Sequence, residues 1–311
     1  MARQTGGVPM FERILVALDG SKSSEMVLPY AEEIAGKFHS EVSLVGVLEN
    51  DKASITSTGI KNNDILYLYL EGKAKEVAEQ GREFGIEASH QITFKLLTGN
   101  IAQNILSYSD EINADLIGLT SRGASSHEKW VLGNVSAKIL RATNKPVLLV
   151  RSRAGEAALR EKRIVKKILL PLDGSEIGES AIPVAESLAI NLGAQLTLIH
   201  VLEPMTRSGM YDMNPGIQLD NLDNRDVEAK AYLAKVSASI KARKGLESSV
   251  VVTMGYHASE IADYAKHHDI DLIAMSTHGR TGLMQWVFGS VTDKILHYGD
   301  TPVLVVRPPK T

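Results

Sequence analysis

The sequence contains no cysteine, so disulfides, thiolate metal sites and cysteine nucleophiles are all excluded. This absence is consistent with a reducing compartment. Aromatic residues make up only 5% of the chain, whereas hydrophobic residues make up 44% and charged residues 23%. That balance is ordinary for a globular protein, and it predicts enough apolar side chains to form a real core.

The sequence also lacks an excess of one charge and any long apolar run. Its 34 Lys and Arg residues against 37 Asp and Glu residues give a formal net charge of −3. This charge provides no electrostatic reason to expect nucleic acid or an anionic membrane as a partner. No stretch approaches the length of a membrane span, and the opening MARQTGGVPMFER lacks the apolar run of a signal peptide. We therefore expect a soluble, cytoplasmic protein with neither kind of partner.

What is present is an internal repeat. The segment TSRGASSHEKWVLGN (120–134) has a counterpart in STHGRTGLMQWVFGS (276–290). The same spacing pairs KPVLLVR with TPVLVVR near the ends of the two halves, and nearly the same spacing pairs ILVALDGS with ILLPLDGS near their starts. A period this long indicates duplicated domains, because the repeats of solenoids recur about every 20 to 50 residues.

The repeat sets the expected domain boundaries. A chain of 311 residues is long for one domain and suits two of about 150 residues each. The charged segment RAGEAALREKR (153–163) is poor in large apolar residues, which is typical of a linker. We predict one domain over 1–152, a linker over 153–163 and a second domain over 164–311.

Each half alternates short apolar runs with amphipathic stretches. Runs rich in Val, Ile and Leu without polar alternation are typical of parallel strands that are covered on both faces. Each half is therefore expected to be a doubly wound α/β domain with an open, parallel, five-stranded sheet of order 3-2-1-4-5. In the second half, strands are predicted over 166–172, 194–202, 248–255, 271–276 and 302–306, and helices over 175–191, 225–243, 258–268 and 289–297.

Two long connections interrupt this pattern. One is expected at 49–63 in the first half and the other at 203–223 in the second. The second connection is rich in Met, Gly and Pro. A mobile flap and a plain surface connection are both consistent with its length.

The predicted topology brings two polar clusters together. In such sheets, ligands bind beyond the carboxyl ends of the strands, where the winding reverses between strands 1 and 4. Strand 1 of the second half ends in LDGS (172–175), and strand 4 runs directly into STHG (276–279). In the first half, strand 1 ends in LDGS as well (18–21). We expect the two clusters of each half to meet in one crevice.

The residues around this crevice favour a phosphate. Gly289 and Ser290 are expected to open the last helix, so that free N–H groups and the positive end of the helix dipole face outward. Glycines at 279 and 289 allow positive φ or a close approach of the ligand. Ser290 and Thr292 add hydroxyl donors, and Asp173 is placed to accept hydrogen bonds from a ribose. Neither a P-loop lysine motif nor GxGxxG after strand 1 is present.

A purely structural interpretation of the same residues stays open. Gly279 is also suited to a simple turn, and Ser290 to a helix N-cap. Asp19 and Asp173 are suited to Asx turns that cap the helices after strand 1. The nine histidines show no metal-ligand spacing, so no metal site is predicted, and no catalytic set is predicted either.

The repeated segments 120–134 and 276–290, together with LDGS after strand 1 and PVLVV as the last strand, resemble the universal stress protein family. The resemblance covers nearly the whole chain. The ATP-binding signature of that family is G-x2-G-x9-G-[S/T] after strand 4. The second half is similar to it, with serine in place of the first glycine. The first half, T-x2-G-x9-G-N over 120–134, departs at the first and last positions. The resemblance thus implies two tandem domains of the adenine-nucleotide α-hydrolase type, with the nucleotide held mainly by the second.

The resemblance also implies which residues would line the two sites. In the second domain they would be Pro171, Leu172, Asp173 and Val201 beside adenine and ribose, Met275, Ser276, Gly279 and Arg280 along the ribose–phosphate path, and Gly289, Ser290, Val291 and Thr292 at the phosphates. Their counterparts in the first domain are Ala17, Leu18, Asp19, Val47, Thr120, Gly123, Gly133, Asn134, Val135 and Ser136. Magnesium would bind through the phosphate oxygens of ATP.

By the same resemblance, the protein is expected to be an ATP-binding regulator of stress adaptation, either non-catalytic or at most a slow ATPase, with a regulatory protein partner that the sequence does not name. Family members pair their last strands across a dimer interface. A homodimer, or pairing of Pro146–Val150 with Pro302–Val306 inside one chain, is therefore expected. Two alternatives stay open. One is a genuine adenine-nucleotide hydrolase, although LDGSKSS and LDGSEIG do not match the SGGxDS loop of such enzymes. The other is a protein-interaction module whose pockets are empty or hold another ligand.

Overall fold

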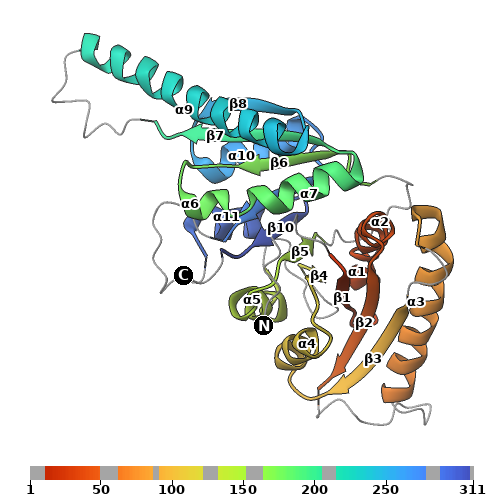
Figure 1. Ribbon diagram of the computed structural model, residues 1–311. Helices are drawn as coiled ribbons and strands as arrows, with labels where there is room; N and C mark the ends of the chain where they lie inside the picture. Colours follow the sequence, from red (N-terminus) through yellow and green to blue (C-terminus); the bar gives the residue numbers. More distant parts are fainter. Residues whose placement is uncertain are drawn as a thin grey trace.

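The computed structural model shows a chain of alternating strands and helices (Figure 1). The residues that it describes are 11–49, 62–86, 91–121, 132–151, 164–204, 215–277 and 288–308. The predicted linker at 153–163, most of the connection at 49–63 and residues 205–214 of the connection at 203–223 lie outside these residues.

The strands of the two halves correspond one to one. In the first half they are β1 (Arg13–Ala17), β2 (Glu41–Leu48), β3 (Ile92–Thr98), β4 (Leu116–Thr120) and β5 (Val147–Val150). In the second half they are β6 (Lys167–Pro171), β7 (Gln195–Leu202), β8 (Ser248–Met254), β9 (Leu272–Ser276) and β10 (Val303–Val306).

The helices also repeat between the halves. The first half contains α1 (Lys22–Glu25), α2 (Leu28–Phe38), α3 (Asn62–Phe84), α4 (Ile101–Glu111) and α5 (Asn134–Ala142). The second half contains α6 (Glu176–Glu179), α7 (Ile182–Leu192), α9 (Pro215–Lys244), α10 (His257–His267) and α11 (Ser290–Tyr298).

The strand order confirms the predicted topology. Strands follow one another as β3-β2-β1-β4-β5-β10-β9-β6-β7-β8, which is the order 3-2-1-4-5 in each half. The two sheets that the sequence predicts are joined into a single ten-stranded sheet, because β5 and β10 pair antiparallel with Leu148 opposite Leu304. The expected pairing of the two last strands is thus confirmed within one chain, whereas a homodimer stays a prediction. β3 and β8 form the outer edges of the sheet.

Both faces of the inner strands are buried, as the continuous apolar runs predict, whereas the edge strands β3 and β8 contain no buried residue. Along β1, Ile14 and Val16 face one core and Leu15 faces the other, because successive side chains of a strand point to opposite faces. The first core contains residues of α2, α3, α7 and α9, and the second contains residues of α4, α5, α10 and α11. Each core contains residues of both β5 and β10. The two cores therefore continue across the junction of the two halves, which we call the seam.

One predicted helix is in fact two. Instead of a single helix over 175–191, α6 ends at Glu179 and α7 begins at Ile182, with Pro183 in its first turn. Proline has no N–H to donate, and its ring would clash with the carbonyl four residues earlier, so a helix cannot continue through it. Pro29 accompanies the same break between α1 and α2.

A second difference concerns the connection at 203–223. Helix α9 already begins at Pro215, ten residues before the predicted start, so the connection after β7 is shorter than expected. The described helices include none that is both long enough and apolar enough to cross a membrane.

Candidate functional site

The second half contains a pocket of about 620 Å³ at the carboxyl ends of β6, β7 and β9. β6 and β9 are neighbours in the sheet and continue into helices on opposite faces, so the pocket lies at the predicted reversal of winding. All predicted second-domain residues that the structure describes line it, namely Pro171, Leu172, Asp173, Val201, Met275, Ser276, Gly289, Ser290, Val291 and Thr292. Gly279 and Arg280 lie outside the described residues.

The turn after β6 is built around Asp173. Gly174 has φ of 81°, a left-handed conformation that favours glycine. Asp173 Oδ1 accepts hydrogen bonds from the Ser175 amide at 3.0 Å and from its hydroxyl at 2.7 Å. Asp173 therefore does form the Asx turn of the structural interpretation. This turn uses two of the about four acceptor positions of a carboxylate.

The same turn explains a glycine that the sequence analysis did not single out. Ser175 caps α6, with its Oγ accepting from the Gly178 amide at 3.0 Å. A Cβ on Gly178 would lie 2.5 Å from Asp173 Oδ1, closer than real contacts allow. Gly178 lines the pocket, so the absence of a side chain here keeps the Asp173 carboxylate accessible from the pocket.

The start of α11 forms the opposite wall. Gly289 is the N-cap residue, and no side chain of the described residues caps this helix. The first amides of a helix have no intrahelical partner, so this end of α11 presents N–H donors and the positive end of the helix dipole. The interpretation of Ser290 as N-cap is wrong, because Ser290 is the first helical residue. Of the two roles considered for Gly289, positive φ is excluded because its φ is −61°, and the close approach of a ligand stays a prediction.

Thr292 differs from its expected role. Its hydroxyl donates to the Ser276 carbonyl at 3.0 Å, and the residue is only 3% exposed. A hydroxyl has one proton, so this side chain anchors the start of α11 to the end of β9 and has no proton left for a ligand. Ser136 anchors α5 to the Thr120 carbonyl in the same way, at 2.9 Å.

A third wall, contributed by α9, was not found from the sequence. The prediction omitted several residues that line the pocket. They include Arg225, Glu228, Ala229 and Tyr232 of α9, His200 of β7, Glu203 directly after β7, and His257 of α10. Their only signal was the long connection at 203–223, which follows β7 at this edge of the sheet. The sequence analysis considered a flap at this connection, but it did not assign the following helix to the site.

Polar contacts fix this third wall. Tyr232 donates its hydroxyl to Glu179 Oε1 at 2.9 Å, and its ring meets that of His200 edge to face at 6.1 Å. Burial, and then the hydrogen bond to the Glu179 carboxylate, raise the pKa of Tyr232 above its usual value, so the hydroxyl stays protonated. At the rim, Arg225 donates to the Glu203 carbonyl at 3.0 Å, and His257 Nδ1 lies 3.0 Å from Glu203 Oε1.

The first half repeats the turn but fills the space above it. The predicted residues Ala17, Leu18, Asp19, Val47, Thr120, Gly133, Asn134, Val135 and Ser136 lie at or next to the ends of β1, β2 and β4 and the start of α5, while Gly123 lies outside the described residues. When Tyr69 is aligned with Tyr232, Leu66 corresponds to Ala229. Leu66 is 8% exposed, and a Cβ built on Gly46 would lie 3.2 Å from Leu66 Cδ2. Leucine side chains of α3 thus pack directly on β2.

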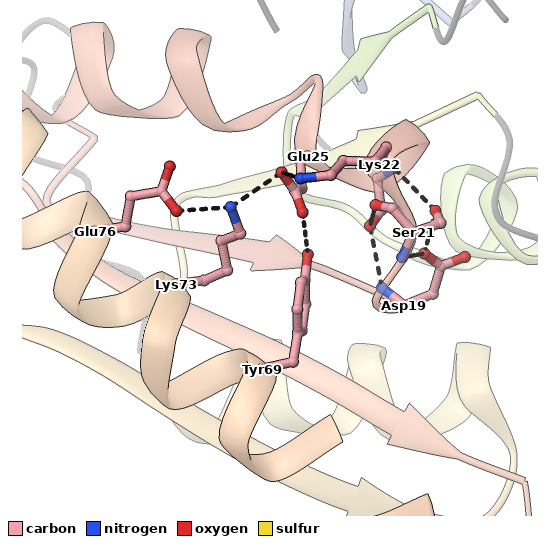
Figure 2. A network of polar contacts seen from close by, with 8 residues as sticks. Asp19, Ser21, Lys22, Glu25, Tyr69, Lys73 and Glu76 are labelled. Carbon is pink, nitrogen blue, oxygen red and sulfur yellow. Dashed lines mark hydrogen bonds and ion pairs between the residues drawn. The ribbon is translucent and has the colours of Figure 1, made fainter. Parts of the chain in front are cut away.

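A network of charged and polar side chains surrounds Tyr69 in the first half (Figure 2). Glu25 accepts from the Tyr69 hydroxyl at 3.3 Å and pairs with Lys73 at 3.0 Å, and Lys73 also reaches Glu76 at 2.7 Å. Burial lowers the pKa of Lys73, but its hydrogen bonds to Glu76 and Glu25 outweigh that effect and raise it overall. In the same alignment, Val236 takes the place of Lys73 in the second half. The two halves therefore share a turn and a tyrosine–glutamate pair but differ in what surrounds them.

Comparison with known proteins agrees with the duplication. The model of the universal stress protein family matches residues 10–151 and again residues 165–307. A universal stress protein of Mycobacterium tuberculosis is 24% identical over 298 residues, covering 94% of this chain and 96% of its own. One of Methanocaldococcus jannaschii is 30% identical over 149 residues, covering 48% of this chain and 86% of its own.

Solved structures share the fold along the whole chain. The crystal structure of a universal stress protein from Archaeoglobus fulgidus superposes with a TM-score of 0.65 at 21% identity, covering 96% of this chain and 98% of the other. A functionally unknown protein from Pseudomonas aeruginosa superposes with a TM-score of 0.69 at 20% identity, covering 97% of this chain and 94% of the other. At these identities the likeness concerns the fold alone.

Proposed function

This chain belongs to the universal stress protein family, and we propose that it is an ATP-binding regulator of stress adaptation whose nucleotide is held mainly by the second domain. One observation carries the proposal. The Asp173 turn, the ends of β7 and β9 and the uncapped start of α11 converge on a single pocket. Hydrogen-bond acceptors, an apolar surface and a helix N-terminus are the three environments that ribose, adenine and phosphate respectively require.

The apolar part of the pocket suits the base. Leu172, Val201 and Met275 are each at least 95% buried and line the pocket together with Ala229 of α9. The two faces of the flat adenine ring gain contact with such side chains. The Asp173 carboxylate then accepts from the ribose hydroxyls, and the first amides of α11 donate to the phosphates.

Magnesium enters this proposal as part of the nucleotide. In the part of the chain that the structure describes, no group of three or more His, Asp or Glu side chains could hold a metal ion. A divalent ion would therefore be held chiefly by phosphate oxygens and would neutralise part of their charge. The fit of ATP to the site depends on the amides of α11 and on Asp173, which do not need the ion to be in position.

We propose that the first domain binds nucleotide weakly or not at all. Leu66 and Leu70 of α3 lie against Gly46 of β2, whereas in the second half Ala229 and His200 both line the pocket. The uncapped start of α5 at Gly133 remains, so a phosphate site persists without the space for a base. Turnover is proposed to be slow or absent, because Asp173, which accepts from Ser175 in the turn, is assigned here to the ribose and not to an attacking water.

Calorimetric titration of the full chain with ATP tests the proposal, supported by mass spectrometry of any small molecule that copurifies. Saturable binding close to one ATP per chain is the expected result, with an adenine nucleotide as the copurifying molecule. Two equal sites per chain would contradict the asymmetry, and no binding of ATP, ADP or AMP would favour the interaction-module alternative.

A further inference from the structure

An arginine follows the last strand of each half and reaches across the seam. Arg151, directly after β5, donates from Nη2 to the carbonyl of Ile295 at 2.9 Å and also to that of Leu296. Arg307, directly after β10, donates from Nη1 to the carbonyl of Thr143 at 2.8 Å. Each domain thus supplies a cation to the carbonyl end of a helix in the other domain, which is α11 for Arg151 and α5 for Arg307.

The two contacts are not equivalent. Ile295 and Leu296 belong to the last turn of α11, whereas Thr143 is the C-cap residue that follows α5. The Ile295 carbonyl already accepts from the Gly299 amide at 3.0 Å, whereas the Leu296 carbonyl is one of the last four of the helix, which have no intrahelical partner and lie at the negative end of the helix dipole. A guanidinium group satisfies both the hydrogen-bond and the charge requirement there. Arg151 therefore contacts the last turn of α11 itself, whereas Arg307 contacts only the residue that caps α5.

The opposite end of α11 is the phosphate wall of the pocket. The helix has nine residues from Ser290 to Tyr298, a length of about 13 Å. At its start, the Gly289 amide donates to the Thr277 carbonyl at 2.8 Å, and Thr292 is anchored to Ser276. Residues of the second domain thus hold the start of this short helix, and Arg151 of the first domain holds its last turn. A shift at either end is transmitted along the helix.

We propose that Arg151 is a positioning residue for the nucleotide pocket, through which the first domain sets the placement of α11 in the second. This inference rests on the proposed ATP site, and it adds that the site depends on a residue of the other domain. Linkage makes the coupling reciprocal, so ATP bound at the start of α11 stabilises the seam at its end. A tandem chain would then report nucleotide occupancy as a change in how firmly its two halves are joined.

The test compares three variants of the full chain, Arg151→Ala, Arg151→Lys and Arg307→Ala. Both alanine variants remove a hydrogen bond across the seam, so both should lower the melting temperature of the free protein. Only Arg151→Ala should weaken ATP binding, by about fivefold or more, the lower range of a typical coupling between two sites. Arg151→Lys keeps the charge but loses the planar fork, so it should recover part of the affinity.

Hydrogen exchange of the segment 295–299 provides the second measurement. Without nucleotide, exchange there should be faster in Arg151→Ala than in the parent and unchanged in Arg307→Ala, and ATP should slow it in the parent. If Arg151→Ala binds ATP as tightly as the parent, or if both alanine variants weaken binding equally, the positioning role is refuted while the ATP site stands. If the parent itself binds no ATP, the proposed function fails, and this role in nucleotide binding fails with it.

Discussion

Tyr232 on α9 donates its hydroxyl to Glu179 on α6 at 2.9 Å, which ties the third wall of the pocket to the turn that carries Asp173. Helix α6 has only four residues and follows that turn directly. The orientation of α9 therefore affects the position of the Asp173 turn, which forms the ribose side of the pocket. The first half has the same tie between Tyr69 and Glu25 at 3.3 Å, but there Lys73 joins it and leucines fill the space beside it.

Gly289→Val should abolish most ATP binding without unfolding the protein. Gly289 has φ of −61° and ψ of 149°, a conformation that valine adopts readily, so the new side chain obstructs the helix start and does not strain the backbone. We expect affinity to fall by at least about tenfold, which corresponds to losing roughly one charge-assisted hydrogen bond. Calorimetry measures the affinity, and circular dichroism checks the fold.

The matched control is Gly133→Val at the start of α5, where φ is −59° and ψ is 146°. Since the first domain is proposed to contribute little binding, this variant should keep the stoichiometry and affinity of the parent. A large loss in Gly133→Val together with none in Gly289→Val would reverse the assignment of the two domains.

Ala229→Leu should fill the base side of the pocket. Ala229 is 6% exposed and lines the pocket, and the corresponding residue of the first half is Leu66. The extra methyl groups would occupy space that the adenine needs, so ATP affinity should fall by at least about tenfold, or about 1.4 kcal/mol. Stability should hold or rise slightly, because the leucine buries apolar surface in an existing pocket.

Val227→Leu is the control for that substitution. Val227 lies on the same helix but is 63% exposed and does not line the pocket. It enlarges an exposed side chain of α9 by one methylene and leaves the base site open, so ATP binding should match the parent. Normal binding by Ala229→Leu would mean that the base does not lie against α9.

Tyr232→Phe should destabilise the protein by about 1 to 3 kcal/mol, because it removes the hydroxyl that donates to Glu179 in a partly buried site. Tyr69→Phe should cost less, since Glu25 keeps its ion pair with Lys73. Urea unfolding at neutral pH measures both values. Equal losses in the two variants would show that Lys73 contributes nothing to holding Glu25.

The same tyrosines predict a loss of stability at alkaline pH. Burial, and then the nearby glutamate, raise the pKa of Tyr69 and of Tyr232 above the value of about 10 that an unfolded chain has. The folded state therefore binds more protons than the unfolded state above about pH 10, so the contribution of these tyrosines to the free energy of unfolding should be constant below that pH and should fall above it. In the double phenylalanine variant, the fall above pH 10 should be shallower than in the parent.

Phosphate release from ATP should be slower than about one per second, below the usual range of enzymatic turnover. The Asp173 carboxylate is the acidic group at the end of β6, and Ser175 already holds it in a turn. A coupled phosphate assay on the full chain measures this rate. If release is faster and Gly289→Val abolishes it, the hydrolase alternative becomes the better account.

The sequence by itself determined the duplication, the strand order of each half and the meeting of Asp173 with Ser276 and Gly289. These features depend on local signals, namely apolar runs that form buried strands and glycines at strand ends, and the parallel topology then brings the carboxyl ends of neighbouring strands together. Only the tertiary structure decided the rest. The Thr292 hydroxyl bonds to Ser276, Leu66 packs on Gly46 of β2, α9 contributes Ala229 and Tyr232, and Arg151 crosses the seam to α11. Each of these features depends on which side chain from a distant part of the sequence occupies the neighbouring space. Packing between the elements decides this, and a local sequence pattern contains no information about such packing.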